Sequence, residues 1–275
     1  MNKVADDAAP LPGLSGVASP VPALPRRDNI LILSCIALVT ALAWLYLFHL
    51  AHEMSSAVAE TNMMAAMGMA VNAPWTVADL ILTFAMWAVM MVGMMGPSAA
   101  PMILLFGAAE SRRGRRGASI AAGTFALGYV VVWTVFSAGA ALAQEALHEA
   151  ALLSASMAVS SPRIGGAVLI AAGVYQLTPW KNRCLTHCRT PLSFLMTHWR
   201  EGRWGAFEMG MRHGAYCLGC CWALMIVLFV VGVMNLVWVA ALAAFVLLEK
   251  VGPQGALVAR ISGAALIVFG IVSLV

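Results

Sequence analysis

Charged residues are scarce in this sequence: they make up 10% of its 275 residues, against roughly 25% in soluble domains. Signatures of several enzyme classes are missing as well. The sequence contains no phosphate-binding glycine loop, no nucleophile elbow, and no second histidine that would turn His52-Glu53 into a zinc-protease helix. Its apolar blocks also lack a chain of carboxylates that could relay protons. These absences exclude ATP-driven transport, leave passive or secondary transport, and predict that the protein is not an enzyme.

Apolar residues make up 62% of the chain and are gathered into long blocks. A helix needs about 20 apolar residues to cross the hydrocarbon core of a bilayer, and within a helix such a segment satisfies its own backbone hydrogen bonds. The sequence therefore predicts an all-α polytopic membrane protein with about seven transmembrane helices. The second block contains Gly96-Pro97 and Pro101, which predict a kink or a break because proline removes a helix hydrogen bond. The expected spans are residues 30–50, 77–106, 119–142, 164–179, 214–233, 236–248 and 256–275.

Basic residues predict the orientation of these spans. Cytoplasmic loops of membrane proteins are enriched in Lys and Arg, and seven spans place 15 of the 16 basic residues on one side, leaving only Arg163 on the other. We therefore expect a multi-pass protein of the bacterial cytoplasmic (inner) membrane, with its N-terminus in the cytoplasm and the lipid bilayer as a partner. The net charge of +4 comes from these loops, so it does not indicate nucleic acid binding. Glu208 and Glu249 lie near span ends and are expected at the membrane interface.

Two parts of the sequence repeat each other. Residues 163–177 and 260–274 match at 8 of 15 positions, and a weaker match relates residues 96–106 to 219–229. Each repeat contains an odd number of spans, so the two would lie in opposite orientations, as in many transporters whose sites lie where the halves meet. The predicted organisation is a disordered cytoplasmic tail (1–28), a first transmembrane helix (29–52), a Met-rich outer segment (53–75), and a six-helix metal-binding membrane domain (76–275) built as an inverted repeat of three plus three helices (76–180 and 204–275).

Two groups of candidate metal ligands lie in the first two blocks. His49 and His52 are three residues apart, so they share a helix face beside the Met-rich segment. Thioethers suit Cu(I), and imidazole accepts copper or zinc. Methionine is also ordinary packing material, so an interfacial helix and a packed core are the alternatives. The second group is a stripe directly before Gly96-Pro97, made of Met90, Met91, Met94 and Met95.

The densest group contains five of the six cysteines, all within residues 184–221. Because a reducing cytoplasm disfavours structural disulfides, clustered Cys and His there predict metal binding or thiol chemistry; buried cysteines acting as small hydrophobes are the alternative. The members in the fifth block are three or four residues apart, so they can share one helix face, and Gly214 and Gly219 would admit a close neighbour. The group consists of Cys184, His187 and Cys188 in the loop after the fourth block, with His213, Cys217, Cys220 and Cys221 in the fifth.

These motifs together resemble a bacterial family of predicted metal-binding integral membrane proteins, a domain of unknown function. The resemblance implies a helical membrane domain that binds a metal, and it covers about residues 75–275. It rests on residues 90–97 with Pro101-Met102, on residues 175–181 running into 184–188, on residues 213–222, and on Asn235 and Glu249-Lys250.

The resulting hypothesis is an integral membrane protein that binds a soft transition metal and either transports it or delivers it to a membrane metalloenzyme. The methionine content favours Cu(I), and zinc is the alternative. The outer His/Met segment would capture the ion, the methionine stripe would pass it inward, and the cysteines would hold it for exchange with a partner such as a metallochaperone. Two other functions stay open: a transmembrane thiol–disulfide electron carrier, and a membrane assembly subunit without chemistry of its own. The carrier is disfavoured because Pro97-Ser98 aligns with Cys220-Cys221, so a symmetric second cysteine is missing.

Overall fold

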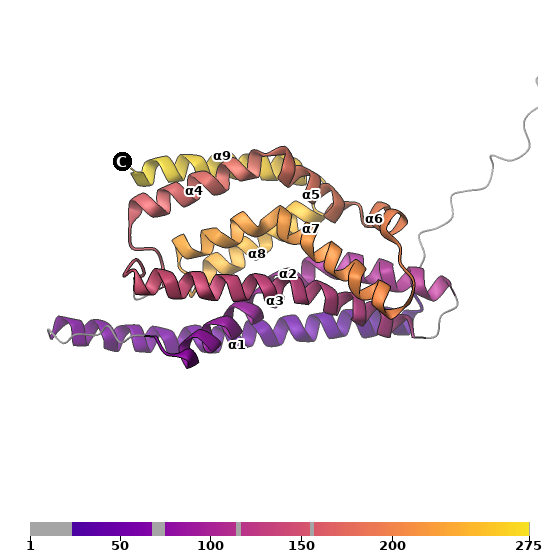
Figure 1. The fold of residues 1–275 in the computed structure, drawn as a ribbon, viewed down its shortest axis with the longest axis horizontal. Helices are drawn as coiled ribbons and strands as arrows, with labels where there is room; N and C mark the ends of the chain where they lie inside the picture. The colour runs from indigo at the N-terminus through magenta and orange to yellow at the C-terminus, as the bar shows by residue number, and fades with distance from the viewer. Residues whose placement is uncertain (1–23, 68–74, 114–116, 155–156, 275) are drawn as a thin grey trace, which may run out of the picture.

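The computed structural model describes residues 24–67, 75–113, 117–154 and 157–274, and this part of the chain is almost entirely helical (Figure 1). Residues 1–23 of the predicted tail and 68–74 of the predicted Met-rich segment lie outside it. The helices are α1 (Arg26–Ala66), α2 (Val77–Arg112), α3 (Ala118–Glu149), α4 (Pro162–Leu177), α5 (Pro179–Arg189), α6 (Pro191–His198), α7 (Gly202–Val231), α8 (Leu236–Val251) and α9 (Gly255–Leu274).

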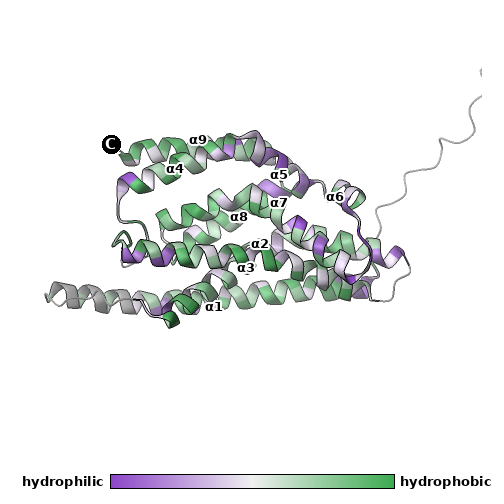
Figure 2. Cartoon of the chain, in the orientation of Figure 1, coloured by the Kyte–Doolittle hydropathy of each residue, from purple (hydrophilic) through white to green (hydrophobic). Residues whose placement is uncertain are grey.

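Five of the helices in the described part of the chain are long and apolar enough to cross a membrane: α1, α2, α3, α7 and α9. The fourth and sixth predicted spans correspond to α4 and α8, which have 16 residues each. Most residues of the long helices are hydrophobic (Figure 2). Many large apolar side chains are exposed on the bundle, as a surface in contact with lipid requires. Leu45 on α1 is 64% exposed and Val272 on α9 is 67% exposed. The protein is therefore an all-helical membrane protein with five candidate spans, fewer than the seven predicted.

Helices α1, α2 and α3 alternate in direction, whereas α3, α7 and α9 run the same way, with α4 and α8 returning the chain between them (Figure 1). Arg113, after α2, forms a 3.0 Å ion pair with Glu201, before α7, so these two helix ends lie together. We call this the basic end of the bundle. At the other end, the Val159 amide before α4 donates to the Phe229 carbonyl near the end of α7 (2.8 Å). The segment containing α4 and α5 therefore returns the chain from the end of α3 to the basic end.

Helix α2 runs without a break through both of its prolines, Pro97 and Pro101, so of the predicted kink or break the break does not occur and the kink stays a prediction. Proline is tolerated in membrane helices where neighbouring groups satisfy the freed backbone. Pro97 and Pro101 free the carbonyls of Gly93 and Pro97. Between these two, the Met95 carbonyl accepts from the hydroxyls of Ser98 and Tyr129, at 2.9 and 3.4 Å. Helix α1 also differs from the sequence prediction, because it continues to Ala66 and thus includes the first part of the predicted Met-rich segment.

Glycines set the closest helix contacts. Helices α4 and α9 lie antiparallel, and a Cβ atom on Gly166 would come within 2.8 Å of the Gly270 carbonyl oxygen. Likewise, a Cβ atom on Gly173 would lie 2.6 Å from the Gly263 carbonyl oxygen. Glycine at these positions therefore lets the two backbones touch. Helix α7 is packed against α3, α4, α5 and α8, so its side chains lie inside the bundle.

Candidate metal centre

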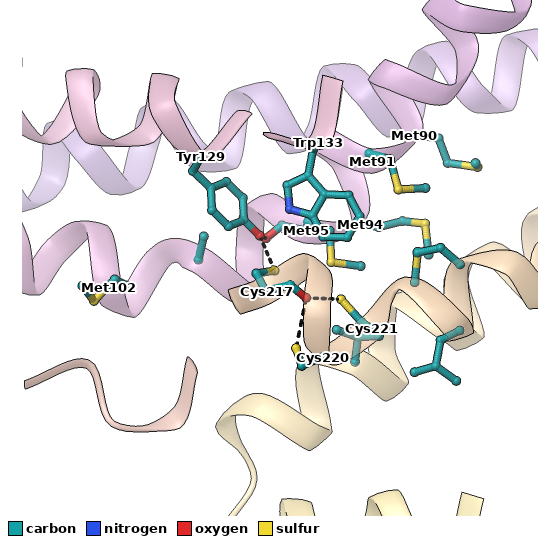
Figure 3. Close-up of a cluster of buried hydrophobic side chains, with 14 of the residues drawn as sticks. Met90, Met91, Met94, Met95, Met102, Tyr129, Trp133, Cys217, Cys220 and Cys221 are labelled. Carbon is teal, nitrogen blue, oxygen red and sulfur yellow. Dashed lines mark hydrogen bonds between the residues drawn. The ribbon is translucent and has the colours of Figure 1, made fainter. Parts of the chain in front are cut away.

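Three cysteines gather on one face of α7, deep in the bundle. Cys217, Cys220 and Cys221 are each 1% exposed. Both later thiols donate to the Cys217 carbonyl, Cys220 at 3.1 Å and Cys221 at 2.8 Å (Figure 3). This arrangement follows from their spacing, because side chains three and four residues apart meet on a helix surface.

Helix α5 adds two more thiols to this cluster. The Sγ atoms of Cys188 and Cys220 are 4.0 Å apart. The Cys184 thiol lies over Gly219, where a Cβ atom would come within 2.9 Å of its Sγ. A hydrogen bond with Cys220, and then burial, raises the pKa of the Cys188 thiol well above its usual value. Burial also raises the pKa of the Cys184 thiol, so metal binding to either one would release a proton.

The Cys188–Cys220 pair has the separation that a bridging metal ion requires. Two metal–sulfur bonds of about 2.3 Å each would span the 4.0 Å gap at an S–metal–S angle of about 120°. Within the described ranges, no three His, Cys, Asp or Glu side chains come together closely enough to hold an ion as they stand. The two thiols are therefore the core of the candidate site, and a third ligand would have to move toward them.

The methionine stripe of α2 lies in the same buried core as the α7 cysteines (Figure 3). Met90, Met91, Met94 and Met95 are all at most 2% exposed. Their burial suits ordinary packing, and it also places a row of soft ligands beside the thiols.

The histidines are more scattered than the cysteines. His213 is buried among the rings of Phe125, Tyr129 and Phe194, and its Nδ1 atom has no hydrogen-bond partner. The His187 ring stacks on that of Tyr216, with centroids 4.3 Å apart.

On α1, His49 and His52 are exposed. The Nε2 atom of His49 lies 3.3 Å from the Glu53 carboxylate. The outer histidines therefore belong to a different part of the molecule from the thiol cluster.

Two residues at the cluster were not predicted from the sequence. The Tyr129 hydroxyl lies 3.0 Å from the Cys217 Sγ, and the Lys250 ammonium lies 2.9 Å from the same atom. Lys250 had been counted with the basic loop residues. The sequence feature that could have pointed to Lys250 as a site residue is its position directly after an apolar block, within the Glu249-Lys250 pair. Tyr129 carried no signal beyond being a polar aromatic residue in an apolar block.

Glu249 is buried in the protein near the end of α8, and its placement at the membrane interface stays a prediction. Its two carboxylate oxygens lie 2.7 and 2.8 Å from the Lys181 ammonium, and both side chains are at most 1% exposed. Arg189 donates to the Glu249 and Gly252 carbonyls, each at 2.7 Å, at the end of α8. A buried charge needs such a partner, and these contacts fix α5 to α8 beside the thiols.

The copper chaperone family PpoB2 has a family model that matches residues 84–273, which is more than half of the chain. The chain belongs to this family of copper chaperones. The part of the chain that the family model matches includes the methionine stripe and the five clustered cysteines. His49 and His52 lie before it in the sequence. Neither a curated protein nor a solved structure is similar enough to the chain to count as a match.

Proposed function

We propose that this member of the copper chaperone family binds Cu(I) in the bacterial cytoplasmic membrane and delivers it to a membrane metalloenzyme. The observation that carries the proposal is the 4.0 Å separation of the Cys188 and Cys220 sulfurs, which suits a soft ion bridged by two thiolates. Family membership supports copper as the cargo and a non-catalytic role. Zinc is the other metal that two thiolates would suit.

The remaining candidate ligands fit a route to this pair. The methionine stripe would pass copper along α2 to the thiols, because thioethers bind Cu(I) weakly enough to exchange it. His213 is retained as a ligand because a buried nitrogen without a partner is costly. Cys184, His187 and Cys188 on α5 are proposed to pass the ion to a cytoplasmic partner, and His49 and His52 to capture it on the outer side.

Metal analysis of the purified protein tests the proposal. After loading with Cu(I) under anaerobic, reducing conditions, we expect the wild type to retain about one copper per chain, and Cys188→Ser with Cys220→Ser to lose most of it. Cys35→Ser is the matched control, because Cys35 is exposed on α1. Full copper retention in the double variant would contradict the proposed site.

A thiol–disulfide electron carrier is the second candidate, because the same pair lies close enough to be oxidised with a modest movement. Counting reactive thiols before and after reduction separates the two functions. The copper site predicts that all six thiols remain free in protein purified under air-free conditions, whereas the carrier predicts that two are gained on reduction.

A further inference from the structure

Lys250 is a buried cation in contact with the thiol cluster. It lies in the last turn of α8 and is 8% exposed. Its ammonium has three partners, the Cys217 Sγ at 2.9 Å, the Ser98 hydroxyl at 3.1 Å and the Met95 Sδ at 3.9 Å. An ammonium has three hydrogens, so these contacts from α2 and α7 fix its position.

The partners of Lys250 differ from those of the other buried lysine. Lys181 is neutralised directly by the carboxylate of Glu249. Among the three partners of Lys250, only the Cys217 thiol can carry a negative charge. Lys250 also interacts electrostatically with Cys220 and Cys221. The positive charge of Lys250 is therefore directed at Cys217, which lies in the same thiol cluster as the pair proposed to bind the cargo.

This charge acts on any metal ion held by the cluster. Thiolates bind Cu(I) and Zn(II) alike, so the sulfur ligands alone do not separate the two metals. By Coulomb's law, a fixed positive charge repels a divalent ion twice as strongly as a monovalent ion at the same position, so it separates two ions that are held by the same number of thiolates. The repulsion is large at this site because the interior of the bundle screens charges poorly.

We propose that Lys250 is a specificity-determining residue that favours monovalent over divalent metal ions at the thiol cluster. The inference rests on the proposed copper site, and it identifies the feature that selects the cargo. Tyr129 supports the arrangement, since its hydroxyl contacts the same Cys217 sulfur as the ammonium.

Competition between the two ions tests the proposal. The full-length protein is equilibrated with Cu(I) and Zn(II) together under anaerobic, reducing conditions, and both bound metals are measured by mass spectrometry. We expect Lys250→Gln to lower the ratio of bound Cu(I) to bound Zn(II) by about tenfold or more relative to the wild type. Lys250→Arg keeps the charge and is expected to restore the ratio to within about twofold.

A purely structural role of Lys250 would lower the uptake of both metals together and leave the ratio unchanged, which would overturn the inference. If Lys250→Gln does not fold, the wild type still decides, because a wild type that takes up Zn(II) as readily as Cu(I) contradicts the inference. Failure of the wild type to retain either metal would instead contradict the proposed function.

Discussion

Gly219 shows how a single residue shapes the candidate site. Its missing side chain makes room for the Cys184 thiol, and its carbonyl accepts a hydrogen bond from the Tyr175 hydroxyl. A methyl group at this position would come within 2.9 Å of the Cys184 Sγ and push it away. Because the thiol is the end of a short side chain, the displacement should alter the site more than the fold.

We expect Gly219→Ala to lower the affinity for Cu(I) by about tenfold, the effect typical of residues that position metal ligands. The measurement is competition for Cu(I) with a soluble chelator. Gly123→Ala is the matched control, since a Cβ atom there meets nothing within 4 Å. An unchanged affinity in Gly219→Ala would show that Cys184 takes no part in binding.

Residue spacing predicted part of the site, and tertiary packing determined the rest. The three α7 cysteines share a helix face as their spacing required, and five clustered thiols marked the region. The contact between Cys188 and Cys220 depends on how α5 folds over α7, which no local pattern encodes. Lys250 was assigned to a loop because charge near a span end is usually solvated, whereas here it faces the thiols. Whether these residues bind metal stays a prediction.

At the scale of helices, glycine contacts decide which helices meet. Gly128 on α3 faces the Phe207 carbonyl of α7, and Gly210 on α7 faces the Phe125 carbonyl of α3, so the two backbones touch in both directions. This crossing holds Tyr129 against Cys217. Small residues allow such close approach in membrane helices, where packing rather than the hydrophobic effect drives association.

We expect Gly128→Ala to destabilise the protein by about 1–3 kcal/mol, because the added methyl group would overlap a backbone carbonyl. Gly123→Ala on the same helix is expected to be neutral or slightly stabilising. The difference in stability is measured from the midpoints of thermal denaturation of both variants in detergent, with size-exclusion chromatography as the readout. Equal midpoints would show that α3 and α7 are not in backbone contact.

The α4–α9 pair bears on the predicted inverted repeat. In the sequence alignment, Gly166 corresponds to Gly263 and Gly173 to Gly270. In the structure, Gly166 contacts Gly270 and Gly173 contacts Gly263. Replacing each glycine of one contact by its aligned partner gives the other contact, so the two contacts are equivalent. A local two-fold axis would give this result, which supports the repeat as an interpretation. The prolines of α2 do not break the helix, because proline is tolerated within membrane helices whose neighbours satisfy the freed backbone.

For the whole molecule, five helices of the described part are candidate spans, and the seven crossings with a cytoplasmic N-terminus stay a prediction. The ion pair between Arg113 and Glu201 places the end of α2 and the start of α7 on one side. Helix α3 ends on the other side, so α4 has to bring the chain back. Composition and charge predicted the membrane class and the alternation of helices. They placed the fourth span within two residues of α4 at each end, but they treated the Met-rich segment as separate although α1 continues into it.

Labelling of introduced cysteines distinguishes seven crossings from five. Ser160, before α4, and Ser193, in α6, are both exposed. In a Cys35→Ser background, we expect a membrane-impermeant maleimide to label Ser160→Cys in intact cells, and Ser193→Cys only after permeabilisation. If α4 did not cross, both positions would lie outside and both would be labelled in intact cells.

If α4 and α8 cross the bilayer, as the seven-span prediction requires, their length has a consequence for the surrounding lipid. At about 1.5 Å per residue, 16 residues span about 24 Å, whereas the hydrocarbon core is about 30 Å thick. Acyl chains beside these two helices would have to shorten or tilt to avoid exposing them to headgroups, at a modest cost for each ångström of mismatch. A copper ion held where α5 meets α7 would then be separated from the opposite surface by less hydrocarbon than elsewhere in the same bilayer.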